Sequence, residues 1–386
     1  MEVYLDNAAT TRAFNSVKEI IVETLEVDYG NPSSMHRKGI DAEKYIKEAK
    51  EILAKALKAD TKEIYFTSGG TESNNMALIG AAYGNKRNGN HIITTKIEHP
   101  SVHNPLIFLE ENGFRISYIS VDSMGKILEE ELLNAVCEDT ILVSLMYVNN
   151  ETGSVQNVKD LSMKIKLKNP VTLVHVDAIQ AFGKYTIYPS REGIDLLSIS
   201  GHKIHGPKGS GVLYVKDKVK LKPILFGGGQ QKGIRSGTEN VPGIAGIGQA
   251  VKEIYKDHAE KINLLYDLKQ YLIEGLKELE DVYINCVSDN LRESAPHIVS
   301  VSFKGIRSEV LLHALEDKNI YVSSGSACAT NHPELSTTLQ AIGLDKSLLD
   351  STLRFSFSVN TTREDITYTL KAVEELIPVL RKYSRH

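Results

Sequence analysis

The chain has 386 residues, of which 41% are hydrophobic and 24% charged, and its formal net charge is −4. This length is enough for two domains, and the ordinary composition excludes a disordered or low-complexity protein. The small net charge excludes a general basic surface for nucleic acid, and no apolar run approaches the roughly 20 residues of a membrane span.

The first residues contain neither the basic nor the apolar stretch of a signal peptide. The three cysteines, Cys137, Cys286 and Cys328, are widely spaced and form no CxxC pair. We therefore expect a cytoplasmic protein with reduced thiols and no metal site.

From about residue 40 to residue 215, strand-like runs alternate with helical patterns. Residues 41–57 predict an amphipathic helix, because their apolar side chains recur at i, i+3 and i+4. These are Ala42, Tyr45, Ile46, Ala49, Ile52, Leu53 and Leu57. Seven short runs rich in β-branched and aromatic residues predict strands at 63–66, 91–95, 114–119, 141–148, 172–176, 195–199 and 211–215. Because several runs are apolar throughout, we expect an α/β fold with a mostly parallel sheet covered by helices.

The rest of the chain predicts a smaller α+β domain. One long helix is expected from about residue 245 to residue 281, leading out of the first domain. Strands are expected near 297–303 and 319–322, an apolar segment at 353–358, and a closing helix at 363–383. We therefore divide the chain into a large domain of residues 15–260 and a small domain of residues 1–14 and 261–386.

Lys203 follows the apolar run 195–199 and precedes a loop rich in glycine and proline. A lysine that is buried or close to other cations has a lowered pKa, and its amine becomes a nucleophile for carbonyl groups. The aldehyde of pyridoxal phosphate (PLP) is such a partner. A lone lysine of this kind is more often a solvated loop residue, so the choice depends on the rest of the chain.

Small and hydroxyl-bearing residues at 67–75 lie between a predicted strand and a predicted helix. Gly70 and Thr71 belong to this run, where backbone N–H groups at a helix N-terminus favour an anion. A phosphate site is one interpretation, and a simple helix-capping turn is the other. No Lys-Ser/Thr pair follows, which excludes a P-loop.

Asp177 and Gln180 follow the strand predicted at 172–176. An ionised aspartate there can pair with a protonated pyridine nitrogen, and the amide of Gln180 can donate to a ring oxygen. The alternative for Asp177 is a helix cap.

His99 and Asn150 also follow predicted strands. An imidazole above the strand ends can stack on a planar ring or move protons, although a lone loop histidine is more often structural. Asn150 can donate to a ring oxygen or a substrate carboxylate, although asparagines at strand ends often only form turns.

Seven motifs, in this order and spacing, resemble those of cysteine desulfurases of the NifS/IscS type, which are class V aminotransferases with the PLP-dependent fold type I. The resemblance extends from near residue 4 to near residue 380. The motifs are 5–11 (LDNAATT), 30–36 (GNPSSMH), 66–75 (FTSGGTESNN), 175–180 (HVDAIQ), 200–209 (SGHKIHGPKG), 235–240 (RSGTEN) and 323–328 (SSGSAC).

The resemblance implies a role for each matching residue. Lys203 binds the cofactor covalently and acts on the substrate proton, and His99 stacks on the pyridine ring. The other implied cofactor contacts are Gly70, Thr71, Asn150, Asp177, Gln180, Ser200, His202 and, from the second subunit of a homodimer, Thr238. Asn150 and Arg354 would hold the substrate carboxylate, a role that suits a planar guanidinium.

Cys328 lies in a run of small residues that predicts a mobile loop. Cys137 and Cys286 have apolar neighbours in sequence, and we expect both to be inert core residues. The resemblance makes Cys328 the nucleophile that takes sulfur from L-cysteine as a persulfide, leaving L-alanine. The sulfur would pass to an acceptor protein in iron–sulfur cluster assembly or tRNA thiolation. A selenocysteine lyase or another class V PLP enzyme is the alternative, and a non-enzymatic sulfur-relay protein is a more distant one.

Overall fold

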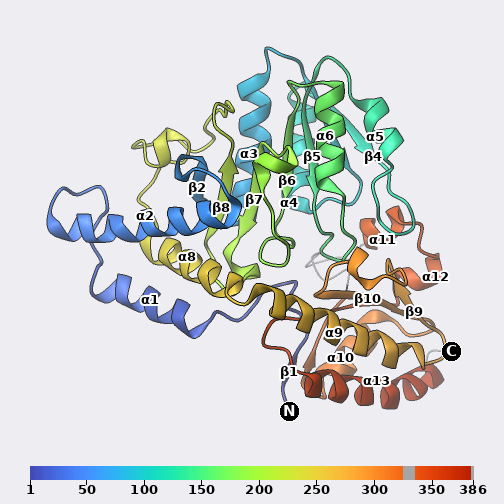
Figure 1. The fold of residues 1–386 in the computed structure, drawn as a ribbon. Coiled ribbons are helices and arrows are strands. Elements are labelled where there is room, and N and C mark those ends of the chain that lie inside the picture. Colours follow the sequence, from blue (N-terminus) through green and yellow to red (C-terminus); the bar gives the residue numbers. More distant parts are fainter. Residues whose placement is uncertain (325–334, 384–386) are drawn as a thin grey trace.

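A seven-stranded sheet forms the centre of the larger part of the computed structural model (Figure 1), which describes residues 1–324 and 335–383. The strand order is β2-β8-β7-β6-β5-β3-β4. The strands are β2 (Ile64–Thr67), β3 (His91–Thr95), β4 (Arg115–Ile119), β5 (Thr140–Met146), β6 (Leu173–Asp177), β7 (Leu196–Ser200) and β8 (Gly211–Val215). Only β8 runs antiparallel to its neighbours, so the predicted mostly parallel sheet is confirmed.

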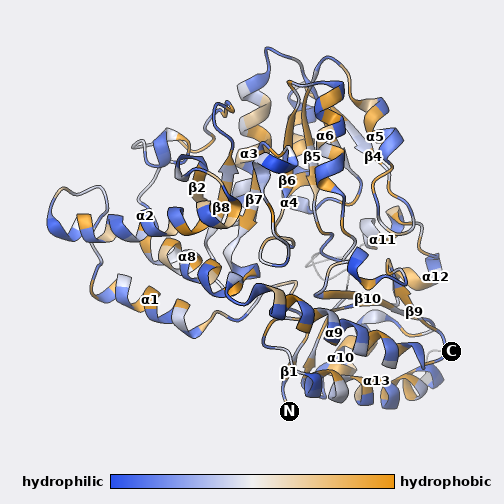
Figure 2. Ribbon diagram, in the orientation of Figure 1, coloured by the Kyte–Doolittle hydropathy of each residue, from blue (hydrophilic) through white to orange (hydrophobic). Residues whose placement is uncertain are grey.

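Helices cover both faces of this sheet, as the apolar strands require. Alternation along each strand directs neighbouring side chains to opposite faces, so Ile92 and Ile93 join different cores. Helices α3 (Gly70–Asn85) and α4 (Pro100–Glu111) cover one face. The other core includes α2 (Arg37–Leu57), α6 (Val158–Lys168) and α8 (Val241–Tyr255). Figure 2 shows the strands as largely hydrophobic between these helices.

A third core forms around a four-stranded antiparallel sheet in the order β12-β13-β10-β9. Its strands are β9 (Val282–Asn285), β10 (Ile298–Phe303), β12 (Ser323–Ser324) and β13 (Thr352–Ser356). Helices α9 (His258–Lys277), α10 (Ser308–Glu316) and α13 (Arg363–Tyr383) pack on it. The division into residues 15–260 and residues 1–14 with 261–386 remains our proposal, supported by these separate cores.

The N-terminus joins this second part of the fold. Strand β1 (Val3–Tyr4) pairs in parallel with β11 (Ile320–Tyr321), and Figure 1 shows the N-terminal segment beside C-terminal elements. The remaining helices are α1 (Asn15–Glu26), α5 (Glu129–Ala135), α7 (Pro189–Glu192), α11 (Thr337–Ala341) and α12 (Lys346–Leu349). Within the described ranges, every helix is too short or too polar to cross a membrane.

The single long helix expected at 245–281 is wrong, because the chain forms α8 and α9 with a break between them. Asp257 adopts a left-handed conformation with φ 50°. Lys261 Nζ donates to the carbonyls of Glu253 and Lys256 and so satisfies the end of α8. The helices serve different cores, α8 against α1 and α2 and α9 against α13 and β9, so one straight helix could not bury both apolar faces.

Candidate active site

The predicted site residues of the large sheet converge at the carboxyl ends of its parallel strands. Asp177 is the last residue of β6, and Lys203 ends a short 3-10 helix, η2 (Gly201–Lys203), directly after β7. His99 follows β3 and caps α4, and Asn150 follows β5. The carboxyl ends of parallel strands share one edge of a sheet, which is where ligands bind in such folds.

Asp177 is a buried carboxylate with two fixed hydrogen bonds. Its Oδ1 accepts from the backbone N–H of Ile179 at 3.0 Å, and its Oδ2 accepts from Asn74 Nδ2 at 2.8 Å. Burial raises the pKa of Asp177, while these hydrogen bonds and the nearby Lys203 act in the opposite direction. A cation placed against this carboxylate would therefore be strongly favoured.

A hydrogen-bonded chain joins Asp177 to His99. Asn74, which is completely buried, also donates to Ser101 Oγ at 2.9 Å, and Ser101 Oγ lies 2.8 Å from His99 Nδ1. The backbone N–H of Ser101 donates to the same Nδ1 at 3.1 Å. Nδ1 is thus an acceptor, and the proton of the neutral ring is on Nε2. Burial lowers the pKa of His99, which favours this neutral form.

Lys203 faces the N-terminal segment of the chain. Its Nζ donates to the carbonyl oxygens of Ala8 at 2.5 Å and Ala9 at 2.6 Å. Gln180 Nε2 donates to the same Ala8 carbonyl at 2.9 Å, which places Gln180 beside the lysine. The motif at 5–11 therefore forms part of the site wall. The half-buried Lys184 donates to the carbonyl of Lys203 at 2.7 Å and fixes its backbone.

The predicted anion site lies where β2 leads into α3. Gly70 is the first residue of the helix, and a Cβ there would lie 2.2 Å from Ile179 Cδ1. Ser200 Oγ, close to Gly70, is buried without a hydrogen-bond partner among the described residues. Thr71 is exposed on the first turn and shares an open cleft of 530 Å³ with His99. An anion would suit this position, because it could bind the N-terminus of α3, the exposed Thr71 hydroxyl and the unpaired Ser200 hydroxyl.

His202 and Thr238 differ in their placement. His202 lies directly beside Lys203, its Nδ1 is 3.2 Å from Thr10 Oγ1, and burial lowers its pKa to about 4. Thr238 is exposed and lines a separate cavity of 150 Å³ with Ser68 and Arg235. Thr238 is not brought together with Asp177 or His99 in its own chain, so its role toward a second subunit stays a prediction.

Arg354 approaches the site from β13 of the smaller sheet. Its Nη2 forms an ion pair with Asp6 Oδ1 at 2.7 Å, and its Nη1 donates to the carbonyl of Asn150 at 2.8 Å. The guanidinium Nε is buried without a partner among the described residues. Arg354 and Asn150 therefore meet, but through the Asn150 backbone, and the guanidinium keeps N–H groups for a further acceptor.

The predictions for the three cysteines differ in how they compare with the structure. Cys328 lies in residues 325–334, outside the described part of the chain. Cys286 is buried, as expected, whereas the expected burial of Cys137 is wrong because this residue is exposed. The turn before β5 places Cys137 at the protein surface, although its sequence neighbour Val136 is buried.

Several residues of the site received no role from the sequence. Asn74 lies within the motif at 66–75 and Ser101 lies two residues after His99, but only the fold shows that they join Asp177 to His99. Glu151 is another such residue: its Oε2 accepts from Ser336 Oγ at 2.5 Å. This bond fixes Ser336, near the end of the segment that carries Cys328, to the loop that contains Asn150. Burial raises the pKa of Glu151.

Comparison with known proteins identifies the family. The class-V aminotransferase model matches residues 3–369. The cysteine desulfurase IscS of Dictyoglomus turgidum is 41% identical over 384 residues, covering 99% of this chain and 96% of that protein. A solved NifS-like protein has a TM-score of 0.93 at 39% identity, covering 98% of this chain and all of that one. The structure of SspA in complex with cysteine has a TM-score of 0.82 at 32% identity, covering 93% of this chain and 100% of that one. The chain belongs to the class-V aminotransferase family and, within it, to the cysteine desulfurases of the NifS/IscS type.

Proposed function

We propose that this protein is a PLP-dependent cysteine desulfurase that converts L-cysteine to L-alanine and receives the sulfur on Cys328 as a persulfide. One observation carries the proposal. The buried Asp177, the neutral His99 and Lys203 converge at one edge of the sheet, and Asn74 and Ser101 join the first two through hydrogen bonds. Family membership and a relative solved in complex with cysteine support the substrate.

The described residues fit the cofactor. Ser200 Oγ needs a partner, and a Cβ at the start of α3 would lie 2.2 Å from Ile179 Cδ1, so a glycine there leaves room for a phosphate without displacing Ile179. Asp177 offers a buried anion to a protonated ring nitrogen. When bound, PLP supplies an electron sink for the substrate α-carbon. We propose Gly70, Thr71, Ser200 and His202 for the phosphate, and Gln180 and Asn150 for the ring oxygen.

The chain's own groups then divide the remaining work. Lys203 Nζ, positioned by the Ala8 and Ala9 carbonyls, holds and moves a proton at the substrate α-carbon. His99 presents Nε2–H, since Nδ1 is occupied, and can exchange that proton near the reacting atoms. Arg354 holds the substrate carboxylate through its remaining N–H groups.

Sulfur transfer requires a thiolate at Cys328. This thiolate attacks the substrate sulfur, so that an S–S bond forms and the Cβ–S bond breaks. The electron pair of the broken bond stays on Cβ, which gains a proton and becomes the methyl group of alanine. Cys328 then carries the persulfide, and a reduced acceptor thiol takes the outer sulfur atom.

We further propose a cytoplasmic homodimer in which Thr238 contacts the phosphate of the second subunit. A reducing compartment keeps Cys328 in the thiol form. An iron–sulfur scaffold or a tRNA thiolation enzyme would accept the sulfur.

The test compares cysteine-dependent alanine production by the purified protein with that of Cys328→Ala and Lys203→Ala. The protein should be yellow and produce alanine. Cys328→Ala should stay yellow and lose turnover, and Lys203→Ala should lose both the native cofactor spectrum and turnover. A wild-type protein that stays colourless with added PLP would contradict the proposal. Faster turnover of selenocysteine that survives Cys328→Ala would favour the selenocysteine lyase.

A further inference from the structure

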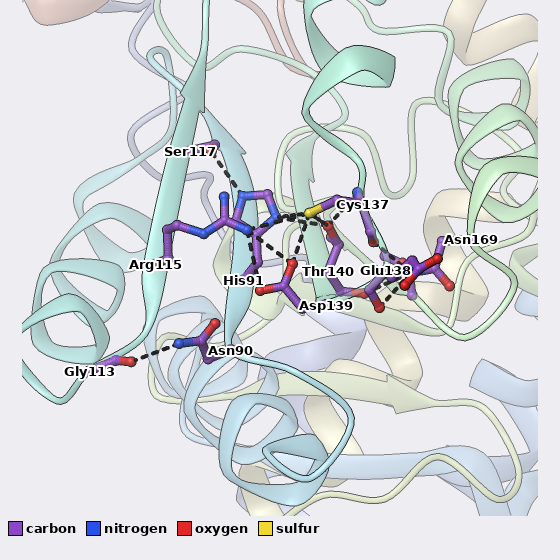
Figure 3. A network of polar contacts seen from close by, with 11 residues as sticks. Asn90, His91, Gly113, Arg115, Ser117, Cys137, Glu138, Asp139, Thr140 and Asn169 are labelled. Carbon is purple, nitrogen blue, oxygen red and sulfur yellow. Dashed lines mark hydrogen bonds and ion pairs between the residues drawn. The ribbon is translucent and has the colours of Figure 1, made fainter.

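A second cluster of reactive side chains lies at the edge of the large sheet opposite the candidate active site. His91 is the first residue of β3, and Cys137 and Asp139 lie in the turn that precedes β5. Arg115, the first residue of β4, lies beside them (Figure 3). These are the amino ends of parallel strands, whereas Asp177 and His99 follow the carboxyl ends. The proposed desulfurase chemistry makes no use of this cluster.

Three different metal-ligating atoms converge here. Cys137 Sγ lies 3.3 Å from His91 Nδ1 and 2.9 Å from Asp139 Oδ1, and all three ligand atoms lie within 4.8 Å of one another. Tetrahedral zinc with ordinary bond lengths places sulfur, nitrogen and oxygen ligands about 3.3–3.6 Å apart. The distances from Cys137 Sγ to His91 Nδ1 and to Asp139 Oδ1 therefore need to grow by at most about 0.7 Å. Cys137 is exposed, so a cation can enter and a water can complete the coordination.

The imidazole of His91 is oriented for ligation by its other contacts. Thr140 Oγ1 accepts the backbone N–H of Cys137 at 2.9 Å, so its own hydrogen is free for His91 Nδ1, 2.8 Å away, or for Cys137 Sγ at 3.3 Å. His91 Nε2 lies 2.9 Å from Ser117 Oγ and can donate to it. Nδ1 is then the unprotonated nitrogen, and its lone pair is open to an ion once the Thr140 hydroxyl turns to Cys137 Sγ. A ring N–H held by an outer partner is the usual support of a metal-bound histidine.

Arg115 is the one cation in contact with the cluster among the described residues. Its Nη2 donates to Asp139 at 3.0 Å (Oδ1) and 3.3 Å (Oδ2), and to Cys137 Sγ at 3.4 Å. A cysteine binds metal in its thiolate form. The Arg115 side chain is 51% exposed, so it can keep Oδ2 and leave Oδ1 to an incoming ion.

We propose that His91, Cys137 and Asp139 form a binding site for one thiophilic divalent cation, for which zinc is the best match. A thiolate, a neutral imidazole and a carboxylate are the ligand types that zinc takes, whereas calcium and magnesium prefer oxygen atoms alone. On binding, the thiol proton of Cys137 passes to solvent, and no oxidation occurs. The ion would join the turn before β5 to the start of β3 and stabilise that edge of the sheet.

The test uses full-length, PLP-loaded protein with Cys328→Ala, so that the catalytic thiol cannot bind the probe. After treatment with a chelator, Co²⁺ is titrated, and the thiolate charge-transfer band and the longer-wavelength ligand-field bands are recorded. Zinc affinity is then measured by competition. We expect one ion per chain. Changing even an outer partner of a metal ligand costs about 10–100-fold, so Cys137→Ser should weaken zinc binding by at least about 100-fold. Asp139→Asn should weaken it by at least about tenfold.

Cys286→Ser is the matched control, because this buried cysteine lies outside the cluster, and it should leave the cobalt spectrum unchanged. Zinc should also raise the melting temperature of the parent but not of Cys137→Ser. An unchanged spectrum and stoichiometry in Cys137→Ser, or no thiolate band in the parent, would overturn the proposal. In the protein with Cys328 intact, Cys137→Ser should keep alanine production within about twofold of the wild type. The metal-binding proposal can therefore fail while the desulfurase proposal stands, and the reverse is also true.

Discussion

Asn74 provides the sharpest test of the site, because one fully buried amide holds both Asp177 and Ser101. The substitution Asn74→Ala removes the 2.8 Å hydrogen bond to Asp177 and the support of the Ser101 hydroxyl beside His99. We expect cofactor binding to weaken, because the Asp177 carboxylate loses a donor that stabilises its charged form.

The size of the effect follows from the type of bond. A hydrogen bond to a charged group contributes about 1.5–3 kcal/mol, and each 1.36 kcal/mol corresponds to one pKa unit. Losing the Asn74 bond should therefore raise the pKa of Asp177 further, because the charged carboxylate loses a donor. Expressed in binding, the same free energy predicts a PLP dissociation constant at least about tenfold higher. The deficit should grow as the pH falls, since protonation of Asp177 removes the charge that pairs with the ring.

The assay is titration of the apoprotein with PLP, followed by absorbance, at several pH values. Ser101→Ala isolates the arm that leads to His99 and should have a smaller effect, because the backbone N–H of Ser101 still caps Nδ1. Asn169→Ala is the matched control for a lost buried asparagine. Asn169 donates to the carbonyls of Cys137 and Thr140 at the opposite edge of the sheet.

Asn169→Ala should lower the melting temperature without weakening PLP binding. If Asn74→Ala is folded and binds PLP with the affinity and pH profile of the wild type, the proposed role of Asn74 is refuted. An equal loss of PLP affinity in Asn169→Ala would show instead that general destabilisation accounts for the effect.

Three further variants test separate parts of the site. Gly70→Ala should weaken PLP binding about tenfold in the apoprotein titration, because its Cβ would lie 2.2 Å from Ile179 Cδ1. Adding Ile179→Val should restore the PLP affinity, and an unchanged affinity in Gly70→Ala would refute the importance of this close approach. Arg354→Lys should raise the KM for L-cysteine about tenfold or more in steady-state assays, since a lysine cannot bind the substrate carboxylate bidentately. Asp6→Asn should raise the KM less. A larger effect of Asp6→Asn would contradict the assignment of Arg354 to the substrate carboxylate. Burial raises the pKa of Glu98 to about 8, above its ordinary value of 4.5. The protonated carboxyl therefore stabilises the fold at low pH, and this stabilisation is lost as the pH rises from about 4.5 to 8. The melting temperature of Glu98→Gln should therefore rise relative to that of the wild type as the pH rises across this range. A difference in melting temperature that does not change with pH would refute the neutral Glu98 carboxyl.

Much of the fold could be predicted from local patterns. The strand β3 was predicted at its observed bounds and β8 likewise, because short apolar runs between turn residues have few other stable states. The break between α8 and α9 could not be predicted, since no proline or glycine marks it. Asp257 adopts its left-handed conformation because the two helices pack on different cores.

The site was predictable where a residue follows a strand directly. Asp177, the last residue of β6, and Lys203, in the short helix after β7, are of this kind, because the ends of the predicted strands place them at the shared edge. Asn74 could not be identified, since its contacts come from residues 27 and 103 positions away. The exposure of Cys137 was missed for the same reason: hydrophobic sequence neighbours do not show which way a turn faces.

The most direct test of the central claim is mass spectrometry of the protein after brief mixing with L-cysteine, without reductant. The account predicts one additional sulfur atom on the peptide that contains Cys328, removable by a thiol, together with an equal amount of alanine. Cys328→Ala should keep its bound cofactor and form neither product. Alanine production by Cys328→Ala at the wild-type rate, or the added sulfur on Cys137 in place of Cys328, would contradict it.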